Sequence, residues 1–473
     1  MEEVVVSEKE FGVHEECGII GIHSSAESDL TKDIYFGLFA LQHRGQESAG
    51  IAVCYNDNKV AYYKNMGLVH EVFGEEELAL LPKTRCGIGH VRYSTTGSSN
   101  VVNAQPVVFY GRAGRMAVAH NGNIVNADKI KNQLISDGHI FQSSIDSEVV
   151  AASINLYATE SLEKGIEKAC AQFVGAFAIV VAANDKLIAV RDRYGLKPLV
   201  MGEKNGDIIF ASESCALDAI EAKFIRDILP GEMVIVNKDH TMHSTFLGRP
   251  QKRTCIFEYV YLARSDSVID GTSVYESRYE CGKILAGLFK IDADIVAGVP
   301  DSALVSARGY SDVSGIPYVD ALSKNRYIGR TFIQPSQSMR ESSVKIKLNA
   351  FRSNIKGKRL ILIDDSIVRG TTSRKIINLL RASGATEVHM LVASPKVKCP
   401  CYFGVDMDTP DQLIGANRST EEIRELIGAD SLHYLPLDLL KTACGGGEFC
   451  TGCFDAGYAM SITNYVCTKH GLE

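Results

Sequence analysis

Cys17 is the residue in this chain whose position points most directly to covalent chemistry. It follows an acidic leader and opens the apolar run 18–22. Removal of residues 1–16 would place its thiol and a free α-amino group on one residue. An α-amine has a pKa of roughly 7.7–8.0, so it can accept a thiol proton near neutral pH. The alternative is a small, inert cysteine buried on a strand.

A second reactive centre is indicated by Asp364 and Asp365, which end the apolar strand predicted at 359–363. A turn rich in small residues follows them, and then a helix. The acids are placed to hold ribose hydroxyls or a Mg²⁺-bound substrate. The turn and the helix N-terminus offer backbone N–H groups to a phosphate. The alternative is that the two acids serve only the turn at the end of a buried strand.

Four polar clusters follow apolar strands in the first half and together describe an amino-acid site. They cover residues 44–48, 89–95, 119–123 and 145–148. An arginine can hold a substrate carboxylate through paired hydrogen bonds, and Asp146 can hold an α-ammonium group. The Asn121 side chain and the Gly122 N–H can form an oxyanion hole. Taken singly, Asn-Gly is also a common hairpin turn and Asp146 a possible helix cap.

These residues are positioned by strands and helices that follow one another in a different order in each half of the chain. The first half groups short strands with blocks of helix, which predicts a layered α+β architecture. The second half alternates strands and helices, which predicts a parallel, doubly wound sheet with ligands at the carboxyl ends of its strands. The first set of strands is 19–22, 49–54, 116–119, 176–181, 187–190 and 233–236, with helices 33–42, 145–158 and 161–171. The second set is 293–299, 317–319, 359–363 and 387–392, with helices 302–311 and 373–383.

Length and composition restrict the class of protein. A chain of 473 residues is long enough for two or three domains, and the polar stretch 248–254 is the best boundary between them. The net charge of −7 does not favour nucleic-acid binding, and no apolar run approaches a membrane span. The acidic leader lacks the basic start and apolar core of a signal peptide. We therefore expect a cytoplasmic protein, in which its 13 cysteines indicate catalysis or metal binding rather than disulfides.

Cys450 and Cys453 form a CxxC pair, which is a moderate signal for zinc, an iron–sulfur cluster or redox chemistry. No thioredoxin-like strand precedes it. A site with four sulfur ligands needs two further thiolates.

At this point the motifs resemble a known family. The segments CGIIGI, LQHRGQESAG, GHVRYSTTG, AHNGNIVN and SIDSE occur in the order found in N-terminal-nucleophile glutamine amidotransferases. With the segment RLILIDDSIVRGTT, the whole chain resembles the glutamine phosphoribosylpyrophosphate amidotransferases. The resemblance implies a propeptide at 1–16, an αββα sandwich at 17–248 and a type I phosphoribosyltransferase domain at 249–473. It also implies conversion of glutamine and phosphoribosyl pyrophosphate to 5-phosphoribosylamine, glutamate and pyrophosphate, the first step of de novo purine synthesis.

The resemblance assigns roles to residues of the first half. Cys17 attacks the glutamine amide, and Asn121 and Gly122 form the oxyanion hole. The remaining contacts are to glutamine and the nucleophile region: Arg92 and Thr95 to the glutamine carboxylate, Asp146 to its amino group, and Arg44 and Gly45 near the nucleophile.

The resemblance assigns the second substrate to two turns of the second half. Asp301 and Ser302 belong to a pyrophosphate-binding turn, and Ser302, Asp364 and Asp365 are the expected Mg²⁺ ligands. The loop after the acids contributes Ser366, Arg369, Gly370, Thr371 and Thr372. A basic segment, 324–349, corresponds to a loop that closes over the substrate.

The iron–sulfur branch of the family supplies the missing sulfur ligands. Cys255 and Cys401 would join Cys450 and Cys453 around a [4Fe–4S] cluster, with zinc as the competing metal. Cys399 and Cys444 are alternative ligands, and the others are expected to be structural: Cys54, Cys86, Cys170, Cys215, Cys281 and Cys467. The family also implies a homotetramer inhibited by adenine and guanine nucleotides.

One departure and two competing interpretations stand beside the resemblance. Ser265 occupies a position where the family usually has proline. One alternative is another transferase with the same amide-hydrolysing half, such as a glucosamine-phosphate or asparagine synthase, but the segment 364–372 argues against it. The other is a non-catalytic regulator that binds phosphoribosyl pyrophosphate or nucleotides. Retention of Cys17, Arg92, Asn121 and Asp146 disfavours that regulator.

Overall fold

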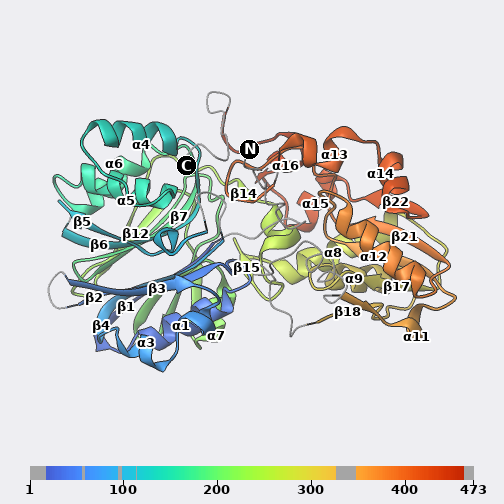
Figure 1. The fold of residues 1–473 in the computed structure, drawn as a ribbon, viewed down its shortest axis with the longest axis horizontal. Helices are drawn as coiled ribbons and strands as arrows, with labels where there is room; N and C mark the ends of the chain where they lie inside the picture. Colours follow the sequence, from blue (N-terminus) through green and yellow to red (C-terminus); the bar gives the residue numbers. More distant parts are fainter. Residues whose placement is uncertain are drawn as a thin grey trace, which may run out of the picture.

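The structure is a computed structural model that describes residues 17–55, 59–93, 99–112, 114–325, 348–407 and 409–462. The two halves of the chain form two bodies that lie side by side (Figure 1). The first half is rich in strands, and the second half alternates strands and helices. Within the described part of the chain, no helix combines the length and apolar character needed to cross a membrane.

The first half contains two antiparallel sheets packed face to face. The seven-stranded sheet runs β11-β9-β10-β1-β4-β2-β3, and the six-stranded sheet runs β13-β12-β8-β7-β6-β5. Strands of the first sheet are β1 (Gly18–Ser28), β2 (Ser48–Tyr55), β3 (Lys59–Met66), β4 (Thr84–Arg92), β9 (Val200–Lys204), β10 (Asp207–Ala211) and β11 (Lys223–Asp227). Strands of the second are β5 (Val107–Gly111), β6 (Gly114–Ile124), β7 (Gly175–Ala183), β8 (Lys186–Arg191), β12 (Glu232–Val236) and β13 (Met242–Phe246).

Strand β7 shows why these sheets must be covered on both faces. Every residue of β7 is buried, although successive side chains of a strand point to opposite faces. Phe177 and Ile179 pack with the helices outside the sheet, whereas Ala178 and Val180 pack between the two sheets. Helices α4 (Ala127–Ser136), α5 (Asp146–Tyr157) and α6 (Leu162–Cys170) cover one outer face; α1 (Thr31–Ala40) and α7 (Ser214–Ala219) cover the other, near the short α2 (Val69–Val72) and α3 (Glu75–Ala79) (Figure 1). The predicted αββα sandwich is confirmed.

The second half is built on a four-stranded parallel sheet in the order β17-β20-β21-β22. Its strands are β17 (Ile295–Gly298), β20 (Arg359–Asp364), β21 (Glu387–Val392) and β22 (Ser431–Tyr434). The larger helices around it are α8 (Val274–Leu288), α9 (Leu304–Ser314), α12 (Thr371–Ala382), α14 (Thr420–Ile427) and α15 (Leu437–Ala443). The expected parallel α/β sheet is therefore confirmed.

Short elements complete the fold. They are β14 (Thr254–Cys255), β15 (Val268–Ile269), β16 (Thr272–Ser273), β18 (Leu322–Lys324), β19 (Leu348–Ala350), β23 (Phe449–Cys450), α11 (Arg352–Ile355), α13 (Ile414–Asn417) and α16 (Gly452–Asp455), with single turns η1 (Val101–Asn103) and η3 (Pro410–Gln412) and the π-helical η2 (Glu258–Leu262). β14 pairs in parallel with β23, which joins segments almost two hundred residues apart. The division at residue 248 stays a prediction.

Some local predictions were wrong. The segment 317–319 is no strand but a single bridge between Tyr318 and Val296, because Pro317 has no N–H to give a ladder. The cluster 119–123 does not follow a strand, since Asn121 and Gly122 pair with Ala178 and Phe177 inside the β6–β7 ladder.

Candidate functional site

Cys17 lies directly before β1, where that strand is flanked by the end of β4. Gly18 pairs with Val91, and the Cys17 Sγ is 3.6 Å from the carbonyl oxygen of Tyr93. Cys17 is only partly buried. The described cysteines expected to be structural are buried, namely Cys54, Cys86, Cys170, Cys215 and Cys281. The thiol thus stands at the rim of the sandwich rather than in its core.

Arg92 and Asp146 are brought to the same region from different elements. Arg92 ends β4, is 2% exposed, and donates from Nη1 to Glu47 Oε1 at 3.2 Å. Asp146 is the first residue of α5, and its Oδ2 accepts from the backbone N–H of Ile124 at 3.0 Å. That bond ties the start of α5 to the end of β6. Thr95, the other predicted glutamine contact, lies outside the described residues.

Asn121 carries the least satisfied polar side chain of this region. It is 1% exposed, and neither its Nδ2 nor its Oδ1 makes a hydrogen bond within the described structure. Burial of such an amide without partners is costly, which favours a site prepared for a ligand. Gly122 follows at φ +145°, where a Cβ would lie 2.0 Å from the carbonyl oxygen of Ala176. Only glycine fits this position in the ladder.

Two histidines line the same strands and were not predicted as site residues. His90 and His120 are buried, and His90 Nε2 lies 3.1 Å from the carbonyl oxygen of His120. Burial, together with nearby Arg92 and His120, lowers the pKa of His90 to about 3, although the backbone contact opposes this shift. Burial also lowers the pKa of His120. The two rings are therefore neutral near pH 7. Their positions in the segments GHVRY and AHNGN were the only sequence feature that could have marked them as site residues.

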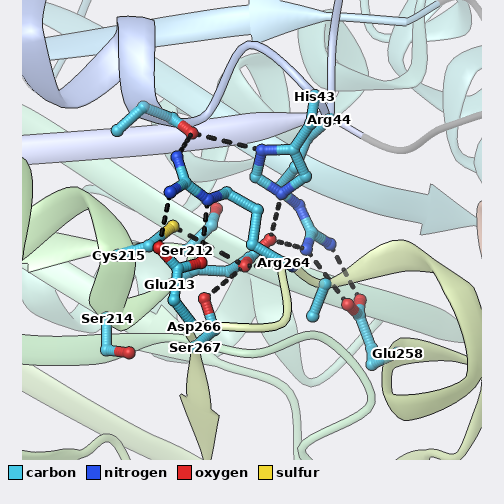
Figure 2. Close-up of polar contacts among 12 residues, drawn as sticks. His43, Arg44, Ser212, Glu213, Ser214, Cys215, Glu258, Arg264, Asp266 and Ser267 are labelled. Atoms are coloured by element: carbon cyan, nitrogen blue, oxygen red, sulfur yellow. Dashed lines mark hydrogen bonds and ion pairs between the residues drawn. The ribbon is translucent and has the colours of Figure 1, made fainter. Parts of the chain in front are cut away.

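Arg44 and Gly45 occupy the loop after α1, pressed against β4. A Cβ on Gly45 would lie 2.5 Å from the backbone carbon of Val91, so this contact requires glycine. The Arg44 side chain is 1% exposed, and its Nε donates to the carbonyl oxygen of Cys17 at 3.2 Å. Its two Nη atoms pair with Glu213 and Glu258, which are both fully buried (Figure 2). Arg44 thus contacts the nucleophile's backbone while its charge is held by carboxylates.

The second reactive centre forms where β20 ends. Ser366 Oγ donates to Asp365 Oδ1 at 2.6 Å, and Ser302 Oγ donates to Asp365 Oδ2. Asp364 Oδ1 accepts from the backbone N–H of Asp365 at 3.0 Å. Burial raises the pKa of both acids, and their proximity raises that of Asp364 further. Two adjacent buried carboxylates, of which Asp365 contacts two serine hydroxyls, are a donor set that a hard divalent cation prefers.

The loop beyond the acids leads into α12 as the motif predicted. Gly370 takes φ +76° immediately before Thr371, the first residue of the helix. Thr371 Oγ1 is buried and makes no hydrogen bond among the described residues. The helix begins two residues earlier than expected, so both Thr371 and Thr372 offer N–H groups of its first turn.

The pyrophosphate turn lies between β17 and α9, whose helix starts at Leu304 rather than 302. Asp301 is exposed and accepts from Lys324 Nζ at 2.8 Å. The rest of the basic segment, 326–347, lies outside the described residues, as do the predicted propeptide 1–16 and Cys467.

The four predicted sulfur ligands line one enclosed cavity. Cys255 and Cys450 are register partners in the β14–β23 pair, Cys453 follows in α16, and Cys401 comes from the segment after β21. Of the alternatives, Cys444 lines a different cavity beside Cys281, and Cys399 is not among the lining residues. The positions of the cysteines therefore favour the four predicted ligands over Cys399 and Cys444.

The chemistry of these donors fits a metal centre that carries positive charge. Burial raises the pKa of Cys453 well above its usual value, and the charges of Cys401 and Cys450 raise it further, so thiolates here need a compensating cation. The Phe403 N–H donates to Cys401 Sγ at 3.4 Å, a contact typical of metal-bound sulfur. Across the described ranges, however, no three His, Cys, Asp or Glu side chains are arranged to hold a single metal ion.

The cysteine cavity borders the glutamine half. Asn123 Nδ2 donates to the carbonyl oxygen of Tyr402 at 2.8 Å, and a Cβ on Gly404 would lie 3.2 Å from the backbone carbon of Gly122. Buried Lys197 lines the cavity between them. The strand carrying Asn121 and Gly122 is therefore packed directly against the cysteine-bearing segment.

Comparisons with known proteins agree with this arrangement. The family model for a glutamine amidotransferase domain matches residues 90–219, and that for a phosphoribosyl transferase domain matches residues 279–398. The amidophosphoribosyltransferase of Methanocaldococcus jannaschii is 47% identical over 463 residues, covering 94% of this chain and 98% of the relative.

Solved structures show the same similarity. The glutamine phosphoribosylpyrophosphate amidotransferase of B. subtilis, complexed with ADP and GMP, has a TM-score of 0.88 and 42% identity, over 96% of this chain and 100% of that chain. A structure described as the allosteric regulatory enzyme of purine biosynthesis has a TM-score of 0.90 and 42% identity, over 97% of this chain and 99% of that one. This chain belongs to the amidophosphoribosyltransferase family.

Proposed function

We propose that Cys17 is the nucleophile that releases ammonia from glutamine, and that the ammonia replaces the pyrophosphate of phosphoribosyl pyrophosphate. The observation that carries the first step is Asn121, whose buried amide makes no hydrogen bond among the described residues, in the half whose rim carries the Cys17 thiol. An oxyanion formed on the glutamine amide would give Asn121 Nδ2 an acceptor. Arg92 and Asp146 supply the charges that a zwitterionic amino acid needs.

The first step balances with groups of this chain. The Cys17 Sγ bonds to the amide carbon, its proton passes to the α-amine of the same residue, and that amine returns a proton to the departing ammonia. Water then cleaves the thioester to give glutamate and the free thiol. The α-amine exists only when Cys17 is the first residue, so this role requires removal of residues 1–16.

In the second step the ammonia nitrogen bonds to C1 of the ribose, and the bond from C1 to pyrophosphate breaks. Asp364 and Asp365 hold the ribose hydroxyls, and the N–H groups at Thr371 and Thr372 hold the 5′-phosphate. Mg²⁺, held by Asp364, Asp365 and Ser302, would supply positive charge to the leaving pyrophosphate. Asp301 and the basic segment after Lys324 lie on the pyrophosphate side.

The finer properties follow from the family and the cavity. We propose that Cys255, Cys401, Cys450 and Cys453 hold a [4Fe–4S] cluster that links the second half to the glutamine half. The complex of the B. subtilis relative with ADP and GMP supports inhibition by adenine and guanine nucleotides, and a homotetramer is the expected assembly.

Isotope transfer tests the coupled reaction. Glutamine labelled with ¹⁵N in its amide should yield labelled 5-phosphoribosylamine, with pyrophosphate released in equal amount. Release of labelled ammonia without product would leave only a glutaminase, and binding without either product would leave a regulator. The intact mass of the active protein should correspond to a chain that begins at Cys17. An active chain that begins at Met1 would contradict the role of the α-amine.

Metal analysis of anaerobically purified protein tests the cluster separately. We expect about four iron and four sulfide per chain, brown colour, and bleaching in air. Colourless protein containing one zinc per chain would contradict it.

A further inference from the structure

We propose that Glu258 is a positioning residue for Cys17, acting through Arg44 across the junction between the two halves. This inference rests on the proposed nucleophilic role of Cys17. It gives the second half a direct part in building the glutamine site, through side chains that contact neither substrate. Figure 2 shows Glu258 facing the Arg44 guanidinium, with Glu213 on the other side of it.

The geometry fixes the arginine in one orientation. Arg44 Nη2 is 2.8 Å from Glu258 Oε1, and Arg44 Nη1 is 3.0 Å from Glu258 Oε2. Two parallel bonds of this kind hold a planar guanidinium in direction as well as in place. The third edge of the same guanidinium donates from Nε to the carbonyl oxygen of Cys17 at 3.2 Å. Glu258 therefore sets the direction from which Arg44 grips the residue that carries the nucleophile.

Because the contact between Arg44 and Glu258 is buried, replacing a single oxygen atom of the Glu258 carboxylate should disturb it. Arg44 and Glu258 are 1% and 0% exposed, so water cannot replace a lost bond. In Glu258→Gln an amide nitrogen must face the guanidinium, and two donors then oppose each other. The expected response is a rotation of Arg44 and a shift of the Cys17 carbonyl.

Glu213 has a separate task in the same cluster. Its Oε2 accepts from the Ser267 hydroxyl at 2.6 Å and from the backbone N–H of Arg264 at 3.0 Å, and its Oε1 lies 2.7 Å from His43 Nε2 (Figure 2). These bonds tie the segment after η2 to the sandwich. Glu213 joins the halves generally, whereas the paired bonds of Glu258 converge on Arg44.

The chain provides a matched control in a second buried ion pair across the same junction. Arg191, in β8, is fully buried, and its Nη1 is 2.7 Å from Asp270 Oδ1. It also donates to the backbone oxygens of Lys197, Gly195 and Ile228, and none of these three contacts reaches Cys17. Asp270→Asn should weaken the junction without disturbing the nucleophile's carbonyl.

The experiment compares Glu258→Gln, Glu258→Asp and Asp270→Asn in the full-length processed enzyme. For Glu258→Gln we expect kcat with glutamine to fall about 10- to 100-fold, while KM for glutamine and the rate with ammonia stay within about twofold. Alkylation of Cys17 by iodoacetamide should slow in parallel, and Glu258→Asp should recover part of both. Asp270→Asn should lower the melting temperature while its ratio of glutamine to ammonia rates stays that of wild type.

The inference fails if Glu258→Gln changes both nitrogen sources equally, as a purely structural residue would, or leaves both unchanged. If Glu258→Gln does not fold, Glu258→Asp alone decides, since it keeps the charge but shortens the reach to Arg44. Equal glutamine and ammonia rates relative to wild type would then overturn the inference. A wild-type enzyme without glutamine-dependent activity would instead refute the proposed function.

Discussion

Buried carboxylates behave in opposite ways at two sites of this molecule, one in each half. Beside the Cys17 region, burial alone would raise the pKa of Glu213, but the charges of His43 and Arg44 and hydrogen bonds from His43 and Ser267 hold it well below its usual value. At the end of β20, burial raises the pKa of Asp364 and Asp365, and among the described residues no cation is close enough to prevail. The cluster around Arg44 contains its counter-charges, whereas the described part of the ribose-phosphate site takes them from what it binds.

This difference teaches how each site depends on its ligand. A site with internal counter-charges is assembled before substrate arrives, so its residues act on one substrate alone. A site of repelling acids is completed by a cation and a phosphate-bearing substrate. Changes at the two sites should therefore separate cleanly when glutamine and ammonia are compared as nitrogen sources.

The largest effect is expected for Cys17→Ala. Loss of the nucleophile should reduce glutamine-dependent synthesis on the order of 10⁴-fold or more, because no other group can form the thioester. Synthesis from ammonia should remain, since the acids at 364 and 365 are untouched. Both rates are measured by pyrophosphate release. Loss of both activities in a folded variant would contradict the separation of the two sites.

Asp365→Asn should act on both nitrogen sources. Charge stabilisation of the transition state at a metal-assisted site is worth several kcal/mol, and about 1.4 kcal/mol corresponds to a tenfold change in rate. We therefore expect roughly a 10³-fold loss with glutamine and with ammonia alike. Asp301→Asn, at an exposed acid of the neighbouring turn, provides a comparison with a smaller loss. Wild-type activity of Asp365→Asn would remove the acid pair from the site.

Asn121→Ala should restrict its effect to glutamine. Loss of one oxyanion-hole donor lowers kcat on the order of 10²-fold. KM for glutamine and the ammonia-dependent rate should change little, since Asn121 is expected to act on the transition state. A rise in KM at constant kcat would show instead that the amide binds the ground state.

The ribose-phosphate site was predictable from local sequence because it is contiguous. One strand, its terminal acids and the following helix lie within residues 359–382, so their order in the chain is their order in space. The parallel sheet was predictable for the same reason. The errors in this half include shifted helix ends at Ser302 and Thr371, the segment 317–319, which forms only a bridge, and β22, which was not predicted.

The glutamine site could not be built from local patterns alone. Cys17, Arg92 and Asn121 come from different strands, and only the pairing of β1 with β4 and of β6 with β7 sets their places. The buried pair of Arg44 and Glu258 joins residues 214 positions apart, and no periodicity marks it. The cysteine cavity has the same character, since Cys255 and Cys450 meet only through the two-residue strands β14 and β23.

The smallest expected effect is a change in how steeply the free energy of unfolding depends on pH in acid. This dependence tests the contrast between the carboxylates directly. The pKa of Glu213 is lowered in the folded state from a usual value of 4.5. Its contribution to stability is therefore present above pH 4.5 and is lost as pH falls toward the folded-state pKa, by up to about 1.4 kcal/mol per pH unit. Glu213→Gln removes this loss, so its unfolding free energy should fall less steeply than that of wild type below pH 4.5.

Urea unfolding between pH 3 and 6 measures that slope, with Asp365→Asn as the control of opposite sign. Because the folded-state pKa of Asp365 is raised, its contribution is present at low pH and is lost as pH rises above the usual value of 3.8. Asp365→Asn should therefore gain stability relative to wild type toward pH 6, in the absence of Mg²⁺ and substrate. Parallel curves for Glu213→Gln and wild type below pH 4.5 would mean that Arg44 and His43 do not keep Glu213 ionised, and the contrast between the two halves would fail.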